Sequence, residues 1–195
     1  MGKMTGNNLT KTITVSGSER NLIIKKCKEV VSAWGLKLPD VEPAVLHFGL
    51  DSFYLVGETE FDVVNDVENC YCGKFIFLFN GQRCPEHYHR FKKETFFIVK
   101  GKVNMTVNGE GRILVRGDFL NMERGQKHTF IALENALILE SSNPDLPHDS
   151  IFTDPKINKK IFGEILNKNN VLNEDMLNEA LKQESRCADF GPLKV

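Results

Sequence analysis

The sequence lacks an excess of charge of either sign. Its 25 lysine and arginine residues nearly balance 26 aspartate and glutamate residues, which leaves a net charge of −1 at pH 7. A protein that binds nucleic acid or an anionic membrane chiefly by electrostatics needs a basic surface, and no basic cluster stands out here. The composition therefore gives no reason to expect a nucleic-acid or membrane partner.

Long apolar runs are also missing. No segment reaches the roughly 20 apolar residues that cross a bilayer, and the polar start MGKMTGNNLT lacks the apolar core of a signal peptide. We therefore expect a cytoplasmic protein. With 195 residues, of which 41% are hydrophobic and 26% are charged, the chain is long enough for one domain with a sizeable core and short for two.

A disulfide framework is not indicated by the five cysteines, because their number is odd and their spacing is irregular. We expect free thiols. Cys70 and Cys72 stand one residue apart, but no second pair follows that would complete a structural zinc site. Both are therefore expected to be small buried side chains.

Helical spacing is confined to the two ends of the chain. From Ser18 to Gly35, apolar residues recur as in an amphipathic helix, with Ser18 as the expected N-cap and Gly35 as the stop. Asn173 opens a second helical pattern near the C-terminus. Between residues 71 and 142, short β-branched and aromatic runs alternate with Asn-Gly and Gly-Asp turns, which is typical of hairpins in a sandwich or small barrel.

These patterns divide the chain into three parts. We expect an N-terminal arm over residues 1–17, a barrel with its leading helix over 18–155, and a C-terminal helical extension over 156–195. Residues 40–69 are of mixed character and are expected to connect the helix to the strands. The aromatic strands FIFLF and TFFIV carry more apolar surface than one small barrel covers, which favours a homodimer.

Four residues of the barrel region have the chemistry of a metal site. Successive side chains of a strand point to opposite faces, so His87 and His89 share a face and their imidazoles can reach one point. Glu94 follows five positions after His89, and a turn or bulge between them can return it on the neighbouring strand. His128, at the start of a later strand, can be brought alongside by a hairpin. Three imidazoles and one carboxylate suit Mn, Fe, Co, Ni or Zn, with open positions for water or substrate.

The same stretch resembles the first cupin motif, a glycine, His-x-His, a glutamate and a second glycine at fixed spacing. The matching residues are Gly81, His87, His89, Glu94 and Gly101. This resemblance implies a mainly β fold, the cupin double-stranded β-helix or jelly-roll barrel, here with an N-terminal helix and a C-terminal helical appendage. It also implies that the metal ligands are His87, His89, Glu94 and His128.

A second cupin motif is matched less completely. Gly117, Gly125 and His128 resemble its glycines and its ligand histidine, but Glu123 stands in place of a proline and Ala132 in place of an asparagine.

A narrower resemblance lies within residues 87–94, HYHRFKKE, which look like the His-x-His-x-x-Lys-x-Glu signature of the D-lyxose ketol-isomerases. The wider similarity covers roughly residues 18–157. It implies an intramolecular oxidoreductase that converts an aldose to a ketose through an enediol, with a free pentose or hexose such as D-lyxose or D-mannose as substrate. It also implies a divalent cofactor, for which manganese is the first choice.

The roles of individual residues follow from this resemblance. Glu140 is the candidate base that moves a proton between neighbouring carbons, Lys92 is the candidate donor to a substrate oxygen, and Asp149 is a candidate substrate contact. Lys92 could instead be a solvated loop lysine like Lys93, and Glu140 could be a carboxylate that only accepts hydrogen bonds. The isomerases resembled have an arginine shortly after the aspartate, where this chain has Ile151, and an arginine's bidentate donors would hold sugar hydroxyls differently.

Two other classes of function stay open. A sugar-binding cupin without catalysis is favoured by Glu123 and Ala132, which depart from the second motif. An Fe(II) cupin dioxygenase would use the same ligand set, because one fold hosts many reactions.

Overall fold

The computed structural model of the protein describes residues 13–50, 52–146 and 149–161. Most of the predicted N-terminal arm and the helical pattern opened by Asn173 lie outside these residues. A helical segment over residues 155–161 follows the last strand, at the start of the predicted C-terminal extension. In the part of the chain that the structure describes, no helix is long and apolar enough to cross a membrane.

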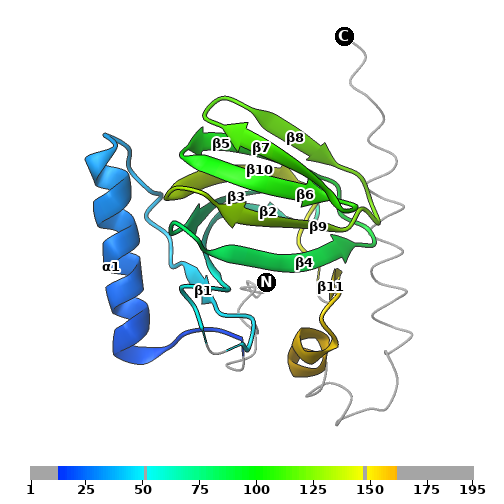
Figure 1. Cartoon of the computed structure of the whole chain (residues 1–195), viewed down its shortest axis with the longest axis horizontal. Helices are drawn as coiled ribbons and strands as arrows, with labels where there is room; N and C mark the ends of the chain where they lie inside the picture. Colours follow the sequence, from blue (N-terminus) through cyan, green and yellow to red (C-terminus); the bar gives the residue numbers. More distant parts are fainter. Residues whose placement is uncertain (1–12, 51, 147–148, 162–195) are drawn as a thin grey trace.

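Two antiparallel sheets face each other and enclose the core (Figure 1). The six-stranded sheet contains, in spatial order, β1 (Ala44–Leu46), β2 (Glu58–Asp66), β3 (Tyr71–Leu78), β10 (Ala136–Ser142), β5 (Glu94–Lys100) and β8 (Phe119–Met122). The five-stranded sheet contains, in spatial order, β11 (Ser150–Phe152), β4 (Arg83–His89), β9 (His128–Ala132), β6 (Lys102–Val107) and β7 (Glu110–Val115). The prediction of a mainly β, double-sheet barrel is confirmed.

The predicted hairpin signals end strands as expected. Asn108 and Gly109 join β6 to β7 with φ values of 49° and 88°. A two-residue turn with positive φ at both positions matches the twist of antiparallel strands, and asparagine and glycine tolerate that backbone conformation best. Turn chemistry therefore accounts for the strand order in this part of the chain.

Residues 40–69 are more than a connection, and that expectation was wrong. They contain β1 and β2, and β2 is a nine-residue strand in the six-stranded sheet. Glu58 and Glu60 lie on the inner face of this strand, whereas Phe61 lies on the outer face and packs under the helix. The inner face is therefore polar and the outer face apolar, the reverse of an ordinary barrel strand. The usual alternation of apolar inside and polar outside is therefore absent from this strand.

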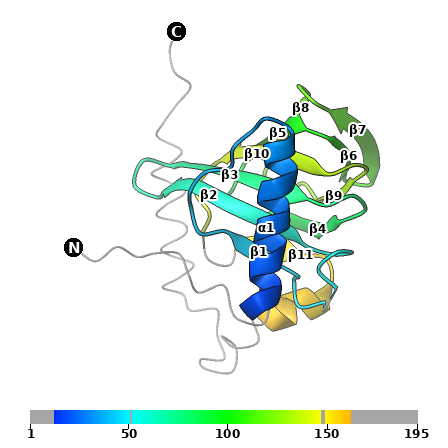
Figure 2. The same ribbon diagram turned by 90° about the vertical axis from the view of Figure 1, so that its left-hand side faces the viewer.

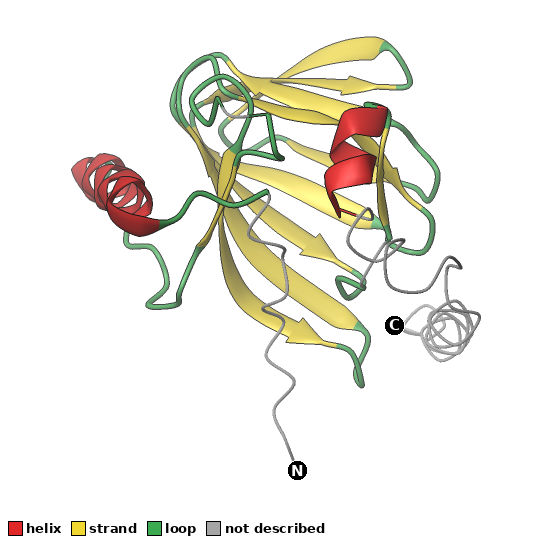
Figure 3. Cartoon of the chain, turned by 90° about the horizontal axis from the view of Figure 1, so that it is seen from below, coloured by secondary structure: helices red, strands yellow, loops and turns green. Residues whose placement is uncertain are grey.

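Helix α1 (Gly17–Ala33) covers the outer face of the six-stranded sheet (Figures 2 and 3). The buried side chains of this contact come from the helix and from strands β2, β3 and β10, and include Ile23, Cys27, Val31, Phe61, Phe77 and Leu137. Because the outer face of this sheet is apolar, the helix shields it from water.

The ends of α1 agree only in part with the sequence prediction. Ser16, not Ser18, is the N-cap residue, since Ser16 has the extended backbone that precedes a helix and Ser18 already lies in the first turn. Gly35 stops the helix as predicted. Its φ of 72° lets the Leu36 amide donate to the Val31 carbonyl oxygen at 3.2 Å, a Schellman closure.

The interior between the sheets changes character along the strands. On β3, Ile76 belongs to the apolar core, whereas Lys74, two residues earlier on the same face, is charged and buried. On β10 the same change occurs from Ile138 to Glu140. One end of the barrel interior is therefore apolar, and the other end is polar.

Free thiols were expected for the cysteines. Cys27, Cys72 and Cys84 are free and buried, in agreement. Cys70 is disulfide-bonded, so the expectation was wrong for this residue. Spacing along the chain does not reveal pairs that only the fold brings together.

Gly101, the last glycine of the first motif, is expected to tolerate no side chain. Its φ is 87°, and a Cβ there would clash with the backbone oxygen of Asn135 and lie 2.8 Å from the Cα of Ala136. Gly109 has nearly the same φ, 88°, but has no atom within 4 Å of an added Cβ. We expect Gly109→Ala to lower the free energy of unfolding by about 1 kcal/mol through backbone strain alone, and Gly101→Ala by about 2 kcal/mol more through the clash.

Urea denaturation of both glycine variants measures this difference. Equal losses of stability in the two variants would contradict the predicted clash at Gly101.

Candidate metal centre

Three of the predicted ligands meet inside the barrel. His87 and His89 lie on β4, and His128 begins β9, where it is the register partner of His87. All three side chains are buried, and the ligand nitrogens lie within 4.8 Å of one another. The structure therefore brings the three imidazoles to one point, as the period of two along β4 predicted for His87 and His89. The expected hairpin was wrong for His128, because β8 and β9 lie in different sheets and β9 pairs with β4 and β6.

Glu94 reaches the same point from the other sheet. It begins β5 in the six-stranded sheet, so the turn after His89 carries the chain across the barrel and not to a neighbouring strand. Its Oε1 lies 3.2 Å from His89 Nε2, and its Oε2 lies 3.2 Å from His128 Nε2. The two sheets therefore each contribute predicted ligands to one centre.

Backbone contacts orient two of the imidazoles. Nδ1 of His87 lies 2.9 Å from the carbonyl oxygen of Pro85, and Nδ1 of His128 lies 3.0 Å from that of Gln126. A carbonyl oxygen only accepts, so each Nδ1 carries the proton and each Nε2 presents a lone pair. This is how metal-binding histidines are usually held.

The unsatisfied atoms of the centre fit a cation. Nε2 of His89, Nε2 of His128 and Oε2 of Glu94 are buried and have no hydrogen-bond partner. Buried polar atoms are normally satisfied, and a divalent cation would satisfy these three together. The donor set therefore fits a metal ion of the Mn, Fe, Co, Ni and Zn group.

The protonation states of His87 and Glu94 also suit ligands. Burial lowers the pKa of His87 well below its ordinary value, and the neighbouring imidazoles of His128 and His89 lower it further. Burial alone would raise the pKa of Glu94, but the charge of Lys92 and the nearby imidazoles of His128 and His89 hold that pKa well below its usual range. A neutral imidazole and an ionised carboxylate are the forms that bind metals. Burial would lower the pKa of His89, but the carboxylates of Asp149 and Glu94 raise it to about 9, so metal binding there would displace a proton.

Asp149 holds the turn that follows the histidine strand. Its Oδ1 accepts the backbone amides of Arg90 and Phe91 at 2.8 and 2.9 Å, and its Oδ2 accepts that of Lys92 at 3.1 Å. The same Oδ2 lies 3.5 Å from Nδ1 of His89. Asp149 therefore orients a predicted ligand, and its predicted contact with substrate stays a prediction.

Asparagine at position 149 is expected to weaken metal binding about 10- to 100-fold, because outer partners of ligand histidines typically contribute that much. The amide keeps one acceptor for the turn but loses the negative charge beside His89. Competition with a chromophoric chelator measures the metal Kd. Asp154→Asn is the matched control, since Asp154 accepts the amide of Lys156 at 2.8 Å and belongs to the turn before residues 155–161; an equal loss in both variants would contradict the role of Asp149.

Lys92 is buried and not solvated. Its Nζ lies 3.0 Å from Glu94 Oε1, 2.7 Å from Glu140 Oε1 and 2.6 Å from Asp145 Oδ1, whereas the side chain of Lys93 is 54% exposed. Burial alone would lower the pKa of Lys92, but the three carboxylates raise it well above its ordinary value. Lys92 is therefore a cation that can donate hydrogen bonds and cannot act as a base.

Glu140 lies beside this lysine on β10, 3% exposed, and its Oε1 also accepts a hydrogen bond from Ser142 at 3.0 Å. The structure therefore brings both candidate catalytic residues to the centre.

Sequence reasoning missed two members of this polar cluster. Asp145 bridges two lysines, because its Oδ2 lies 2.5 Å from the Nζ of Lys74 while its Oδ1 contacts Lys92. Lys74 was visible as a single charge within the apolar strand YCGKFIFL, an unusual place for a lysine. No comparable pattern marks Asp145, which follows β10 in a loop.

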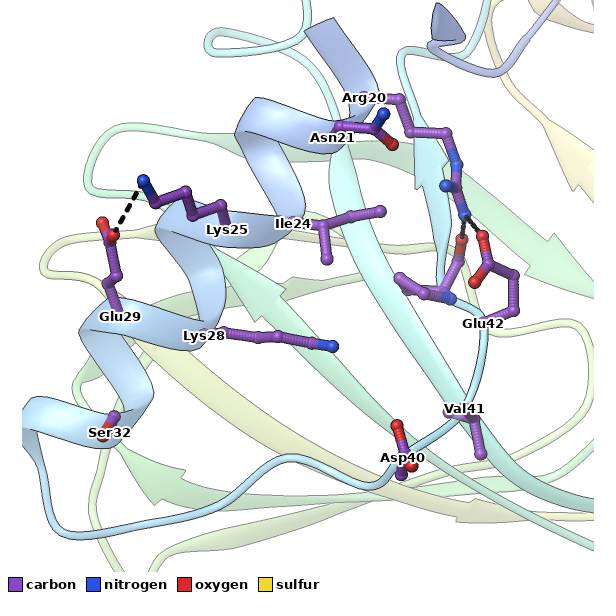
Figure 4. Close-up of a pocket in the computed structure, with 11 residues that line it drawn as sticks. Arg20, Asn21, Ile24, Lys25, Lys28, Glu29, Ser32, Asp40, Val41 and Glu42 are labelled. Atoms are coloured by element: carbon purple, nitrogen blue, oxygen red, sulfur yellow. Dashed lines mark hydrogen bonds and ion pairs between the residues drawn. The ribbon is translucent and has the colours of Figure 1, made fainter. Parts of the chain in front are cut away.

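A surface groove lies elsewhere on the molecule. It has a volume of about 910 Å³ and runs between α1 and residues 40–43 (Figure 4). Its charges are largely paired with each other, as in the ion pairs of Arg20 with Glu42 and of Lys25 with Glu29. None of its lining residues belongs to the metal centre.

Comparisons with known proteins agree with this geometry. The cupin domain family model matches residues 76–140. D-lyxose ketol-isomerase of Cohnella laeviribosi is 30% identical over 143 residues, which cover 59% of this chain and 78% of that protein. D-lyxose/D-mannose isomerase of Thermosediminibacter oceani is 32% identical over 117 residues, 46% of this chain and 65% of that protein. Quercetin 2,3-dioxygenase of Bacillus subtilis is 31% identical over 99 residues, 48% of this chain but 29% of that protein.

A solved structure extends the similarity of fold. The L-ribose isomerase of Acinetobacter sp. DL28 in complex with L-ribose superposes with a TM-score of 0.64 at 14% identity, over 76% of this chain and 96% of that one. Two facing antiparallel sheets with His-x-His, glutamate and a later histidine inside define a cupin. This chain belongs to the cupin superfamily, and within it to the family that contains the D-lyxose ketol-isomerase of Cohnella laeviribosi. At the level of this family, the similarity supports a sugar isomerase.

Proposed function

We propose that this protein is a metal-dependent aldose–ketose isomerase that acts on a free pentose or hexose, such as D-lyxose or D-mannose, through an enediol. The observation that carries the proposal is the buried pair of Lys92 and Glu140, 2.7 Å apart, beside the four predicted metal ligands. Isomerisation needs a Lewis acid for the oxygens, a base for one carbon-bound proton and a donor for the developing charge. The proposal is supported because the residues that would hold the Lewis acid lie beside candidates for the base and the donor.

The mechanism assigns separate tasks to these groups. His87, His89, Glu94 and His128 would hold a divalent cation, which would supply Lewis-acid stabilisation of the charge that develops on the sugar's oxygens. Glu140 takes the proton from the carbon next to the carbonyl and returns it to the neighbouring carbon. Lys92, a permanent cation here, donates a hydrogen bond to a substrate oxygen and balances the charge of Glu140.

Finer properties belong to the same proposal. Manganese is our first choice of metal, with Zn, Fe, Co and Ni as alternatives, because three imidazoles and one carboxylate suit all of them. A cytoplasmic homodimer that uses a small sugar and binds neither nucleic acid nor membrane is the expected setting.

A sugar-binding cupin without catalysis was suggested by two departures from the second motif. Glu123 forms an ion pair with Lys93 at 2.7 Å, and both side chains are more than half exposed. Ala132 is buried at the far end of β9 from His128. Neither departure moves the ligand histidine, so both are compatible with catalysis.

The Fe(II) dioxygenase alternative is supported by the similarity to quercetin 2,3-dioxygenase. The surroundings of the centre favour the isomerase, because two lysines and several carboxylates suit a polyol better than the apolar substrate of many oxidations.

A substrate and metal panel separates the three functions. The protein loaded with Mn, Co, Zn or Fe(II) is incubated with pentoses and hexoses, and ketose formation is followed with and without oxygen. Isomerisation that does not require oxygen supports the proposal. Sugar binding without turnover in every metal would identify a binding protein, and oxygen uptake with diketones or flavonols would identify a dioxygenase.

A further inference from the structure

A row of charged side chains extends from the metal centre across the inner face of the six-stranded sheet. It begins at Glu94 on β5 and continues through Glu140 on β10 and Lys74 on β3 to Glu60 on β2. Lys74 is the register partner of Glu140 on one side and of Asp62 on the other. The row therefore occupies four neighbouring strands.

Lys74 is the central residue in the half of this row that lies farther from Glu94. It is 5% exposed, and its Nζ contacts Asp145 Oδ2 at 2.5 Å, Glu60 Oε2 at 3.5 Å and Asp62 Oδ1 at 3.9 Å. Burial alone would lower the pKa of Lys74, but these carboxylates raise it well above its ordinary value. A permanent ammonium with three donors is thus fixed about two strands from Glu94.

Stability does not explain this arrangement. Removing two charges from water costs several kcal/mol, and apolar side chains of similar volume are often as good or better in such positions. Ile76, next to Lys74 on the same face, shows that the barrel accepts apolar side chains there. The charge at position 74 is therefore better explained by a ligand.

Glu58 gives a second, independent indication. It lies two residues before Glu60 on the same face of β2 and is 4% exposed, yet its Oε2 has no hydrogen-bond partner. Burial, followed by the charge of Glu60, raises the pKa of Glu58 well above its ordinary value. The row thus ends in a buried carboxyl group with one oxygen, Oε2, that has no hydrogen-bond partner.

The side chain of Asn65 holds the backbone of the bridging residue Asp145 in place. Asn65 at the end of β2 donates from Nδ2 to the Asp145 carbonyl oxygen at 3.1 Å and accepts the Asp145 amide on Oδ1 at 3.0 Å. This reciprocal pair fixes the loop after β10 against β2. Asp145 can therefore position both Lys74 and Lys92.

The dimensions fit an extended sugar. Neighbouring strands are about 4.8 Å apart, which puts β3 about 10 Å from β5. An extended carbon chain advances about 1.2 Å per bond, so five or six carbons with their oxygens span on the order of 6 to 8 Å. A sugar with its first two oxygens at the metal centre would pass over Glu140 and end near Lys74.

We propose that Lys74, positioned by Asp145 and Glu60, binds the hydroxyl groups at the far end of an open-chain sugar and makes the protein selective for chain length. Alternating ammonium donors and carboxylate acceptors match a row of hydroxyl groups, each of which both donates and accepts. The inference rests on the proposed function, because it takes the metal centre as the anchor of the reacting end.

Linear polyols test the subsite without turnover. Glycerol, D-arabinitol and D-mannitol are titrated calorimetrically into the manganese-loaded wild type and into Lys74→Met, which keeps most of the length of the side chain but removes its charge. We expect wild type to bind the five- and six-carbon polyols at least about 10-fold more tightly than glycerol, and Lys74→Met to lose about 10- to 100-fold for the longer polyols. Glycerol binding is expected to change by less than about twofold.

Control measurements distinguish loss of the subsite from loss of folding or of metal binding. Asp66→Asn changes a carboxylate at the end of β2 that accepts hydrogen bonds from Asn69, and it should leave the chain-length preference unchanged. Metal content and the thermal midpoint are measured for each variant, and Lys74→Gln replaces Lys74→Met if the latter does not fold. A loss that is equal for all three polyols, or no loss, would overturn the proposal.

The same data distinguish this inference from the proposed function. Chain-length selectivity that depends on Lys74, without isomerisation of any sugar, would leave the subsite standing and remove the isomerase. Isomerisation that does not depend on Lys74 would leave the isomerase standing and remove the subsite.

Discussion

Glutamine at position 140 is expected to lower kcat about 1000-fold while the metal content stays that of the wild type. The amide is nearly isosteric with the carboxylate and can still contact Lys92 and Ser142, but it cannot take a proton from carbon. The measurement is the steady-state rate of the manganese-loaded protein on its best sugar, together with metal analysis. Exchange of the substrate's carbon-bound proton with heavy water should fall in parallel, because the same residue performs that step.

Ser142→Ala is the matched control for Glu140→Gln. It removes the hydrogen bond donated to Glu140 Oε1 at 3.0 Å but leaves the carboxylate, so we expect a loss of kcat below about 10-fold. Glu140→Gln with a rate within 10-fold of the wild type would place the base at another residue.

Alanine at position 128 is expected to remove metal binding and, with it, isomerisation. Without the His128 imidazole the six-stranded sheet still contributes Glu94, but the five-stranded sheet keeps only His87 and His89. We expect the metal Kd to rise by at least about 100-fold, beyond the effect of losing an outer partner. The rise in thermal midpoint that metal gives the wild type by mass action should also disappear.

His47→Ala is the control for His128→Ala. His47 lies outside the barrel centre, where its Nδ1 accepts the Gly49 amide at 2.9 Å, so its loss should leave the metal Kd unchanged. Metal analysis, chelator competition and thermal denaturation with and without manganese check both variants. Wild-type metal content in His128→Ala, with activity lost, would show that the histidine serves the substrate and not the metal.

Local patterns were sufficient to predict much of the barrel and of the centre. The period of two along a strand placed His87 and His89 together, and the turn residues marked where strands end, although the chain reaches β9 from β8 in the opposite sheet and not through a hairpin. The strand β2 escaped prediction because its inner face carries Glu58 and Glu60, so the expected alternation of apolar and polar residues was absent. Polar lining of a barrel interior hides a strand from any prediction based on burying apolar surface.

The sequence by itself determined the candidate ligand types, the stretch from Gly81 to Gly101 and the strand on which two histidines share a face, because these depend on spacing within a few residues. Only the tertiary structure decided that Glu94 arrives from the opposite sheet, that Lys92 is buried, and that Asp145 joins it to Lys74. Those contacts depend on register between strands and on the path of the loop after β10. Such pairings are set by the packing of the whole barrel, and no local pattern specifies them.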